Sequence, residues 1–367
     1  MNDISMAQSL TITELLLDLV STDMNFSDIH FEQDHPVMLQ MPSGWVPAEN
    51  IPPVTREDIA VFLSAIDPKW EDTIATRAVS RAIDLFSCRL RINAFPISGG
   101  KSYSINVRRQ PLRPLPLEET GLPRFMRVQA ANQNGLILVT GQTGSGKTTT
   151  LASMVDSINK NRAAHIITIE DPIEFVHERN RSIISSKEVG LDTPSFAQGL
   201  HDALRQKPDV IVVGEIRDRQ TADTVFAAAE SGHLVLATLH TNSALGALSK
   251  LLSWFPDELH HRSRMLAASL QCVIAQTLIP SKDGSERVLA TEVLLNMDRQ
   301  VAEMLSDPTR HSALADYMRM NKDKMSHNLN FSITRLLREE KITSREAMNY
   351  TNDRLELMEL IKPKSGA

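Results

Sequence analysis

Eight consecutive residues, 141–148, have types and spacing suited to holding a nucleoside triphosphate. They read Gly-Gln-Thr-Gly-Ser-Gly-Lys-Thr, the complete pattern G-x-x-x-x-G-K-[ST]. Three glycines let the backbone fold closely around an anion, and amides at the start of the following helix point at phosphate oxygens. The sequence therefore predicts binding of ATP or GTP. The expected contacts are Gly141, Thr143, Gly144, Ser145, Gly146, Lys147, Thr148 and Thr149.

The segments on either side of this loop are those that a phosphate-binding loop needs. The run 135–140 is apolar and β-branched, as in a buried parallel strand, and the run 148–155 can open a helix. Lys147 should reach the β- and γ-phosphates, and the hydroxyl of Thr148 should bind Mg²⁺. The alternative is a tight glycine turn that binds nothing.

Three further apolar runs follow the loop, and each ends in a residue that could assist phosphoryl transfer. The runs cover residues 165–170, 210–215 and 234–240. They end in Glu170, Glu215 and His240. Active residues collect at the carboxyl ends of strands in a parallel sheet that is covered on both faces. One acid could activate the attacking water, and the other could hold Mg²⁺ through its water shell.

Simpler interpretations exist for the same residues. Glu170 could merely cap or solvate a loop, because Asp171-Pro172 is a turn signal. His240 could donate a hydrogen bond to the γ-phosphate, but His240 and His233, which lie at the two ends of one run, could also be ordinary core or loop histidines.

The remaining patterns predict an α/β protein with several parts. Apolar residues recur at helical spacing over 12–20, and strand-like runs at 27–32, 90–95 and 103–107 suggest an α+β module. Four prolines then interrupt any regular element. The expected parts are an N-terminal domain over 1–109, a linker over 110–123, a nucleotide-binding domain over 124–295 and a helical C-terminal region over 296–367.

The composition of the chain excludes some classes of binding partner. The 367 residues carry 39 Lys and Arg against 45 Asp and Glu, a net charge of −6, so the basic footprint of a nucleic-acid-binding protein is missing. Cys88 and Cys272 form no C-x-x-C pair, which excludes a structural zinc site built on cysteines and predicts buried, reduced thiols. Neither a signal peptide nor a run of ~18 apolar residues is present. We expect a cytoplasmic protein without a transmembrane segment.

Four motifs, in order, resemble those of the secretion ATPase superfamily of P-loop motors, and within it the type IV pilus retraction ATPases of the PilT and PilU type. The resemblance covers nearly the whole chain. Residues 141–148 look like the Walker A loop, 168–175 like the Asp box, 203–218 like the atypical Walker B region, and 232–242 like the His box.

This resemblance implies a homohexameric ring of subunits, each with a PAS-like N-terminal domain and a RecA-like motor domain. It implies that Glu170 is the catalytic glutamate and that Glu215 is the Walker B acid, which acts through Mg²⁺. His233 and His240 match the His-box pair. Arg91 and Arg108 match segments from which the family supplies arginines to the nucleotide site, although arginines at strand edges are also ordinary solvated surface.

Departures from the family pattern refine the expected function. Two cysteines cannot build the tetracysteine zinc module of assembly and type II secretion relatives, which favours the retraction branch. The stretch 298–305 lacks the Ala-Ile-Arg-Asn-Leu-Ile motif of that branch and looks more like PilU, and Lys207 replaces a commonly acidic residue. We expect an ATPase that retracts a pilus by acting on a platform protein in the inner membrane. The ATPase itself would be peripheral to that membrane. The alternatives are a type IVB secretion ATPase and an accessory ATP-binding subunit that joins a second retraction ring.

Overall fold

The structure is a computed structural model that describes residues 11–22, 24, 26–41, 44–85, 88–320 and 325–362. The start of the chain, on which the expected absence of a signal peptide rests, lies outside these residues. The chain divides into two compact units, residues 1–113 and 114–367. Both units mix helices and sheet, so the predicted α/β class is confirmed. The predicted boundaries of the domains and of the linker stay predictions.

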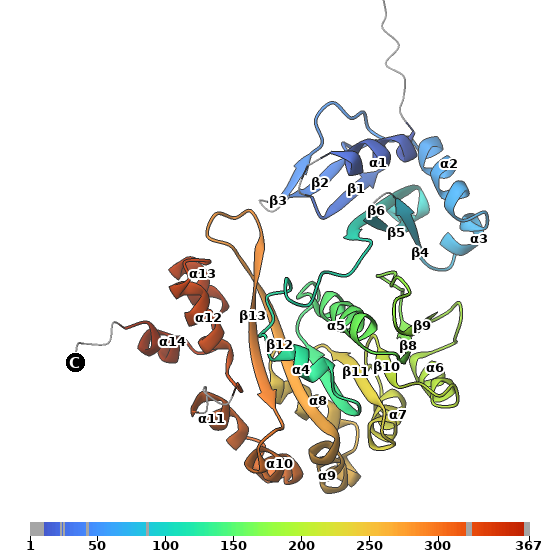
Figure 1. Cartoon of the computed structure of the whole chain (residues 1–367). Coiled ribbons are helices and arrows are strands. Elements are labelled where there is room, and N and C mark those ends of the chain that lie inside the picture. Colours follow the sequence, from blue (N-terminus) through green and yellow to red (C-terminus); the bar gives the residue numbers. More distant parts are fainter. Residues whose placement is uncertain are drawn as a thin grey trace, which may run out of the picture. The chain divides into compact units, whose positions relative to one another are not determined.

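The first unit is one antiparallel sheet with helices packed on one of its faces (Figure 1). Its strand order is β3-β2-β1-β6-β5-β4. The first helix begins where Thr11 and Glu14 form a capping box, and its five apolar residues at helical spacing are buried, as predicted. The elements are α1 (Ile12–Ser21), β1 (Asp28–Glu32), β2 (Met38–Met41), β3 (Gly44–Pro47), α2 (Arg56–Ile66), α3 (Trp70–Ile74), β4 (Val79–Leu85), β5 (Cys88–Ile97), η1 (Ser98–Gly100) and β6 (Ser102–Pro111).

Alternation along β5 and β6 leaves the other face of this sheet polar. Leu90, Ile92 and Val107 point into the core, whereas Arg91 and Arg108 lie opposite one another on the other face. The sheet is therefore apolar toward its helices and charged on its second side.

The second unit is built on a seven-stranded sheet with the order β13-β12-β7-β11-β10-β8-β9. All neighbouring strands run parallel except the edge strand β13, which is antiparallel to β12. The four apolar runs predicted as parallel strands are β7, β8, β10 and β11. The strands are β7 (Gly135–Thr140), β8 (His165–Glu170), β9 (Ile183–Glu188), β10 (Val210–Val213), β11 (Leu234–Leu239), β12 (Leu270–Pro280) and β13 (Arg287–Leu295).

Helices cover both faces of this sheet, which explains why its central strands are continuously apolar (Figure 1). One face packs on α4 and α5, and the other packs on helices between α6 and α11. The helices are α4 (Met126–Ala130), α5 (Lys147–Asn161), α6 (Phe196–Ala203), α7 (Arg219–Glu230), α8 (Ala244–Ser253), η2 (Pro256–Glu258), α9 (Leu259–Ser269), α10 (Arg299–Ser306), η3 (Pro308–Arg310) and α11 (Ala313–Met320).

The C-terminal part is helical, as predicted, and packs on the hairpin of β12 and β13. Its core joins Ile279 and Ala290 of the hairpin to Leu329, Ile333 and Leu357. The last helices are α12 (Leu329–Arg338), α13 (Ser344–Tyr350) and α14 (Arg354–Ile361). Within the described ranges, no helix combines the length and the apolar character that a membrane span requires.

Candidate active site at the carboxyl edge of the sheet

The predicted phosphate loop lies between β7 and α5. Gly141 and Gly146 have φ values of 152° and 86°, which side-chain-bearing residues rarely adopt. A Cβ on Gly141 would lie 2.4 Å from Oγ of Ser145 and 2.6 Å from the carbonyl oxygen of Gln276. Gly141 is therefore required by both backbone conformation and space, and the loop turns tightly into the first turn of α5.

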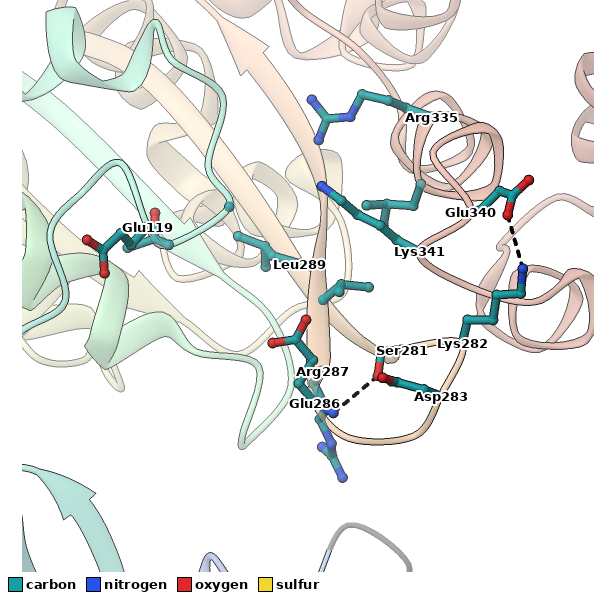
Figure 2. Close-up of a pocket in the computed structure, with 14 residues that line it drawn as sticks. Glu119, Ser281, Lys282, Asp283, Glu286, Arg287, Leu289, Arg335, Glu340 and Lys341 are labelled. Atoms are coloured by element: carbon teal, nitrogen blue, oxygen red, sulfur yellow. Dashed lines mark hydrogen bonds and ion pairs between the residues drawn. The ribbon is translucent and has the colours of Figure 1, made fainter. Parts of the chain in front are cut away.

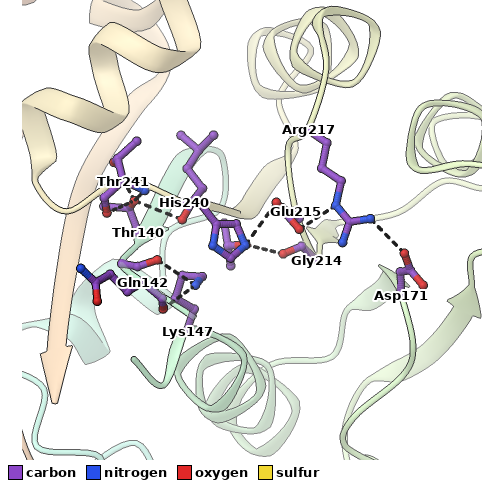
Figure 3. A network of polar contacts seen from close by, with 12 residues as sticks. Thr140, Gln142, Lys147, Asp171, Gly214, Glu215, Arg217, His240 and Thr241 are labelled. Carbon is purple, nitrogen blue, oxygen red and sulfur yellow. Dashed lines mark hydrogen bonds and ion pairs between the residues drawn. The ribbon is translucent and has the colours of Figure 1, made fainter. Parts of the chain in front are cut away.

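Lys147 begins α5 and turns back over the loop. Its Nζ donates to the carbonyl oxygens of Gly141 and Gln142 at 2.9 and 3.0 Å (Figure 3). Burial lowers the pKa of Lys147, while the negative charges of Glu215 and Glu174 oppose this shift. The ammonium group is thus held at the mouth of the loop beside Glu215.

The other predicted residues of the phosphate loop lie on either side of this lysine in the sequence. Ser145 is buried, and its Oγ has no hydrogen-bond partner. Thr143 and Gly144 are exposed, and Thr148 and Thr149 are half-buried on the first turn of α5. The loop therefore combines an unsatisfied hydroxyl, a buried ammonium group and helix-start amides, which are donors suited to phosphate.

Glu215 is placed by backbone contacts with two neighbouring strands. The amide of Gly214 donates to Ile169 of β8 at 2.8 Å, and the amide of Ile216 donates to Thr238 of β11 at 3.0 Å. A Cβ on Gly214 would lie 3.2 Å from the carbonyl oxygen of Ile169. Glu215 is consequently fixed beyond the end of β10, at the carboxyl edge where the phosphate loop lies.

The carboxylate of Glu215 has a partner on each oxygen (Figure 3). Nε2 of His240 lies 3.2 Å from Oε1, and Nε of Arg217 donates to Oε2 at 2.7 Å. Arg217 also donates to Oδ2 of Asp171 at 3.1 Å. The hydrogen bond with Glu215 is the main cause that raises the pKa of Arg217. This network joins the Asp box, the Walker B segment and the His box.

His240 is held by the end of the strand that carries the phosphate loop. Thr140, the last residue of β7, accepts from the amide of Thr241 at 2.9 Å and lies 2.8 Å from the hydroxyl of Thr241. His240 therefore lies between the last residue of β11 and Thr241, which Thr140 holds. Its imidazole points toward Glu215 (Figure 3).

Glu170 ends β8, one strand beyond β10 in the sheet. It is half-buried, and its Oε1 accepts from the hydroxyl of Thr168 at 2.8 Å. Since β8 and β10 are parallel neighbours, Glu170 and Glu215 emerge at the same edge. The structure thus brings Lys147, Glu170, Glu215 and His240 to one side of the sheet.

His233 is not brought to this site. It precedes β11, and its carbonyl oxygen accepts from the amide of Gly135 at the opposite edge of the sheet. Its Nδ1 contacts Ser231 and Ala228. A strand of this length places it roughly 20 Å from His240. A nucleotide contact from His233 of the same subunit is therefore a prediction that the geometry does not support.

Arg91 and Arg108 belong to the first unit. They are directly opposite on β5 and β6, and Nε of Arg108 donates to Oδ1 of Asp28 at 2.9 Å. Asn106 contacts the same oxygen at 3.4 Å. Asp28 thus orients Arg108 on the polar face, and a role of either arginine at a nucleotide stays a prediction.

Sequence reasoning missed Arg217 as a member of the site. It lies two residues after Glu215, so a signal was available in the spacing: both could face the same side of an extended segment. The sequence marks Asp171, before Pro172, as part of a turn, and the structure adds its ion pair with Arg217.

A cavity of about 620 Å³ lies elsewhere in the second unit (Figure 2). It is lined by the β12–β13 hairpin, the end of α12 and residues 119–121. Its charges balance, with four basic and four acidic side chains, and Lys282 is paired with Glu340 at 3.2 Å. It includes none of the predicted site residues, so we do not assign the nucleotide to it.

Comparison with known proteins supports the resemblance. A family model described as "Type II/IV secretion system protein" matches residues 77–353. The type IV pilus ATPase PilU of Pseudomonas aeruginosa is 39% identical over 247 residues, which cover 67% of this chain and 64% of PilU. The match thus spans less than two thirds of PilU. The type IV pilus retractation ATPase PilT of the same organism is 40% identical, over 77% of this chain and 82% of PilT.

Solved structures extend the similarity to nearly the whole chain. The pilus retraction motor PilT with bound ADP matches with a TM-score of 0.83 and 34% identity, over 95% of this chain and 99% of PilT. The ATPase DotB of Legionella pneumophila matches with a TM-score of 0.82 and 25% identity, over 93% and 96% of the two chains. With the family model matching more than half of its residues, this chain belongs to the type II/IV secretion system protein family.

Proposed function

We propose that this protein is an ATP-hydrolysing motor that powers retraction of type IV pili. The observation that carries the proposal is the convergence of Lys147, Glu215 and His240 at the mouth of a glycine loop. The similarity to PilT over both units supports the link to retraction. The same geometry fits a triphosphate substrate, because the hydrogen-bond donors of the loop and of the following helix start lie around the turn where a phosphate group would bind.

Binding of ATP would begin with Lys147. Its ammonium group leaves the carbonyl oxygens of Gly141 and Gln142 and moves to the β- and γ-phosphates, which are stronger acceptors. Ser145, whose hydroxyl is buried and unsatisfied, gains a partner when phosphate enters.

The residues present also fit Mg²⁺. A hydroxyl on Thr148 and a carboxylate on Glu215 are hard oxygen donors, which this cation prefers, and Glu215 would act through water. When bound, Mg²⁺ would neutralise charge on the phosphates. Arg217 would then release Oε2 of Glu215, which it holds at 2.7 Å.

Hydrolysis would follow from the two acids and the histidine. Glu170, at the end of β8, would orient and deprotonate the attacking water. His240 would donate a hydrogen bond to the γ-phosphate and, through Glu215, sense its loss. Arg91 and Arg108 would add positive charge from the first unit of a neighbouring subunit.

We infer that six copies form a ring. Nucleotide-driven opening and closing between a first unit and a neighbouring second unit would supply movement. The ring would work in the cytoplasm, at the inner membrane, against a platform protein of the pilus machine. A second retraction ring could join it, since the PilU relative is about as similar as PilT.

ATP turnover by the purified chain tests the enzymatic part. We expect steady release of phosphate that falls by about 10²-fold or more in Lys147→Ala and in Glu170→Gln. Lys160→Ala, on the same helix but exposed, should keep wild-type turnover. Binding of ATP without turnover would instead favour the accessory subunit.

Deletion of the gene tests the biological part. Loss of a retraction motor should leave cells with excess surface pili and without twitching, whereas bald cells would indicate assembly. Normal pili combined with defective protein export would favour the second candidate, a type IVB secretion role.

A further inference from the structure

Glu292 of β13 is a buried acid that the proposed mechanism does not use. Only 5% of its surface is exposed. Its Oε1 accepts from the amide of Ala244, the first residue of α8, at 2.8 Å. Burial raises the pKa of Glu292, while hydrogen bonds from the backbone of Ala244 and of Leu329 lower it. The carboxylate therefore holds the start of α8 directly, and the next residue of β13, Val293, pairs with His327 just before α12.

The sheet register places Glu292 level with the phosphate loop. Glu292 pairs with Ala275 of β12, and Ala275 pairs with Thr140 of β7. Thr140 immediately precedes Gly141. Two strand spacings, about 10 Å, therefore separate the end of the phosphate-loop strand from Glu292.

The His240 loop, residues 240–244, is hydrogen-bonded to the two outer residues of this paired set, Thr140 and Glu292. Thr140 holds Thr241 through the hydroxyl and the amide, and Glu292 holds the amide of Ala244. Between them, Thr241 donates to the carbonyl oxygen of Ser243 at 3.2 Å. Only Asn242 and Ser243 lie between the two held residues, Thr241 and Ala244, which leaves little freedom for His240, the residue just before Thr241.

The second helix at Glu292 belongs to the C-terminal part of the chain. His327, just before α12, exchanges backbone hydrogen bonds with Val293 at 2.8 and 2.9 Å. Asn328 caps α12, and its side-chain amide donates to both oxygens of Glu356 at 2.7 and 2.9 Å. The start of α12 is therefore tied both to β13 and to α14.

This connection continues through buried polar contacts. Asn330, fully buried, donates to Glu356 at 2.8 Å and to the carbonyl oxygen of Asp353 at 2.8 Å. Thr351 donates to Asn330 at 2.5 Å. A movement of the start of α12 would disturb these contacts, because buried polar groups are costly to leave unpaired.

We propose that Glu292 is a positioning residue that fixes the His240 loop and joins it to the start of α12. Its two oxygens can accept from both helix starts at once, and each start favours a negative charge. Nucleotide-dependent movement of His240 would thereby reach the C-terminal helices. The link from His240 to hydrolysis rests on the proposed function, whereas the mechanical joint does not.

Hydrogen–deuterium exchange tests the joint without requiring hydrolysis. A non-hydrolysable ATP analogue should slow exchange of wild-type peptides covering 141–148, 240–247 and 326–332. Glu292→Gln keeps the shape but has one acceptor oxygen, so protection should persist at 141–148 and fall at least about threefold at 326–332. Glu286→Gln, exposed on the same hairpin, should behave as wild type. Unchanged protection at 326–332 in Glu292→Gln, or none in wild type, would refute the joint.

A double-mutant cycle tests the action through His240. Glu292→Gln should lower kcat about tenfold while KM for ATP changes less than about threefold, because the phosphate loop is untouched. Adding this change to His240→Ala should lower kcat no further. Multiplicative losses would refute a shared role. If wild type hydrolyses no ATP, the proposed function fails, and the exchange experiment still decides the joint.

Discussion

His240 and Glu215 meet at the carboxyl edge of the sheet, where Nε2 of the histidine lies 3.2 Å from Oε1 of the glutamate. They come from the ends of adjacent strands, β11 and β10. Lys147 lies near enough for the charge of Glu215 to oppose the burial effect on its pKa. A change in the charge of the bound phosphates can therefore affect the ends of both β10 and β11 through the contact between Glu215 and His240.

Replacing His240 tests this contact. We expect His240→Ala to lower kcat about 10- to 100-fold with little change in ADP affinity, because the loop that binds the phosphates stays intact. Phosphate-release kinetics and calorimetric ADP binding would measure the two effects. His201→Ala, at an exposed position on α6, is the matched control. A loss of ADP binding equal to the loss of turnover would argue against a role in hydrolysis.

Arg217 is expected to compete with Mg²⁺ for Glu215. It neutralises Glu215 and Asp171 through hydrogen bonds of 2.7 and 3.1 Å. Removing this positive charge in Arg217→Ala should lower the Mg²⁺ concentration for half-maximal ATP binding by about threefold or more. Titration with Mg²⁺ at fixed ATP would measure it, with Arg217→Lys as the charge-retaining control. A higher Mg²⁺ requirement would show that Arg217 assists the cation.

Gly141 should tolerate no side chain. Its φ of 152° and the approach of a Cβ to within 2.6 Å of the carbonyl oxygen of Gln276 predict a cost of about 2–5 kcal/mol for Gly141→Ala. Gly284→Ala, at a hairpin tip where a Cβ meets nothing within 4 Å, should cost only the backbone strain of about 1 kcal/mol. Unfolding and nucleotide binding measure both variants. Equal behaviour would contradict the packing argument.

Much of the fold was predictable because its signals are local. Five buried apolar residues at helical spacing predicted α1, and continuous apolar runs predicted β7, β8, β10 and β11. The same runs predicted which side chains leave the sheet at its carboxyl edge. Glu170, Glu215 and His240 follow from strand direction alone.

The rest depended on contacts between distant segments. That Thr140 of β7 holds Thr241, the residue after His240, depends on the pairing of β7 with β11, which spacing does not give. The partner of Glu292 is 48 residues away, so no local pattern marks it as a helix cap. The spacing of Arg217 from Glu215 is a weak signal, and only the folded positions of Glu215 and Asp171 show that Arg217 pairs with both.

His327 predicts a loss of stability in acid. It is 6% exposed, and burial lowers its pKa from 6.5 to about 4. The unfolded chain therefore binds a proton that the folded chain does not, so its contribution is complete above about pH 6.5 and is lost as pH falls toward 4. Glu292, whose pKa is raised, has the opposite sign.

Urea unfolding at two pH values would isolate this histidine. Between pH 7 and pH 5, wild type should lose about 2 kcal/mol more than His327→Gln, which cannot titrate in this range. His201→Ala, at an exposed position, is again the control variant. Identical pH dependence of wild type and His327→Gln would contradict the buried neutral state.

Mixed assemblies would test whether the first unit acts on a neighbouring subunit. Arg91 and Arg108 lie opposite each other on the polar face, so a phosphate approached by one would be close to the other. If they serve the nucleotide of another subunit, Arg91→Ala and Glu170→Gln subunits are each inactive alone, but mixing them pairs some intact arginines with intact glutamates. We expect mixed rings to regain measurable turnover, up to about a quarter of wild type for random mixing at equal amounts, because both changes must be absent from one shared site.

The control for mixing is a pair of defects in the same unit. Lys147→Ala and Glu170→Gln both disable the second unit, so their mixture should regain nothing, whatever the arrangement of subunits. Asp28→Asn adds a graded test, because it removes the charge that holds Nε of Arg108 at 2.9 Å and should weaken turnover without abolishing it. Recovery in the Arg91 mixture but not in the Lys147 mixture requires a site completed by two subunits. No recovery in either mixture would exclude a role of the arginines at the nucleotide of another subunit.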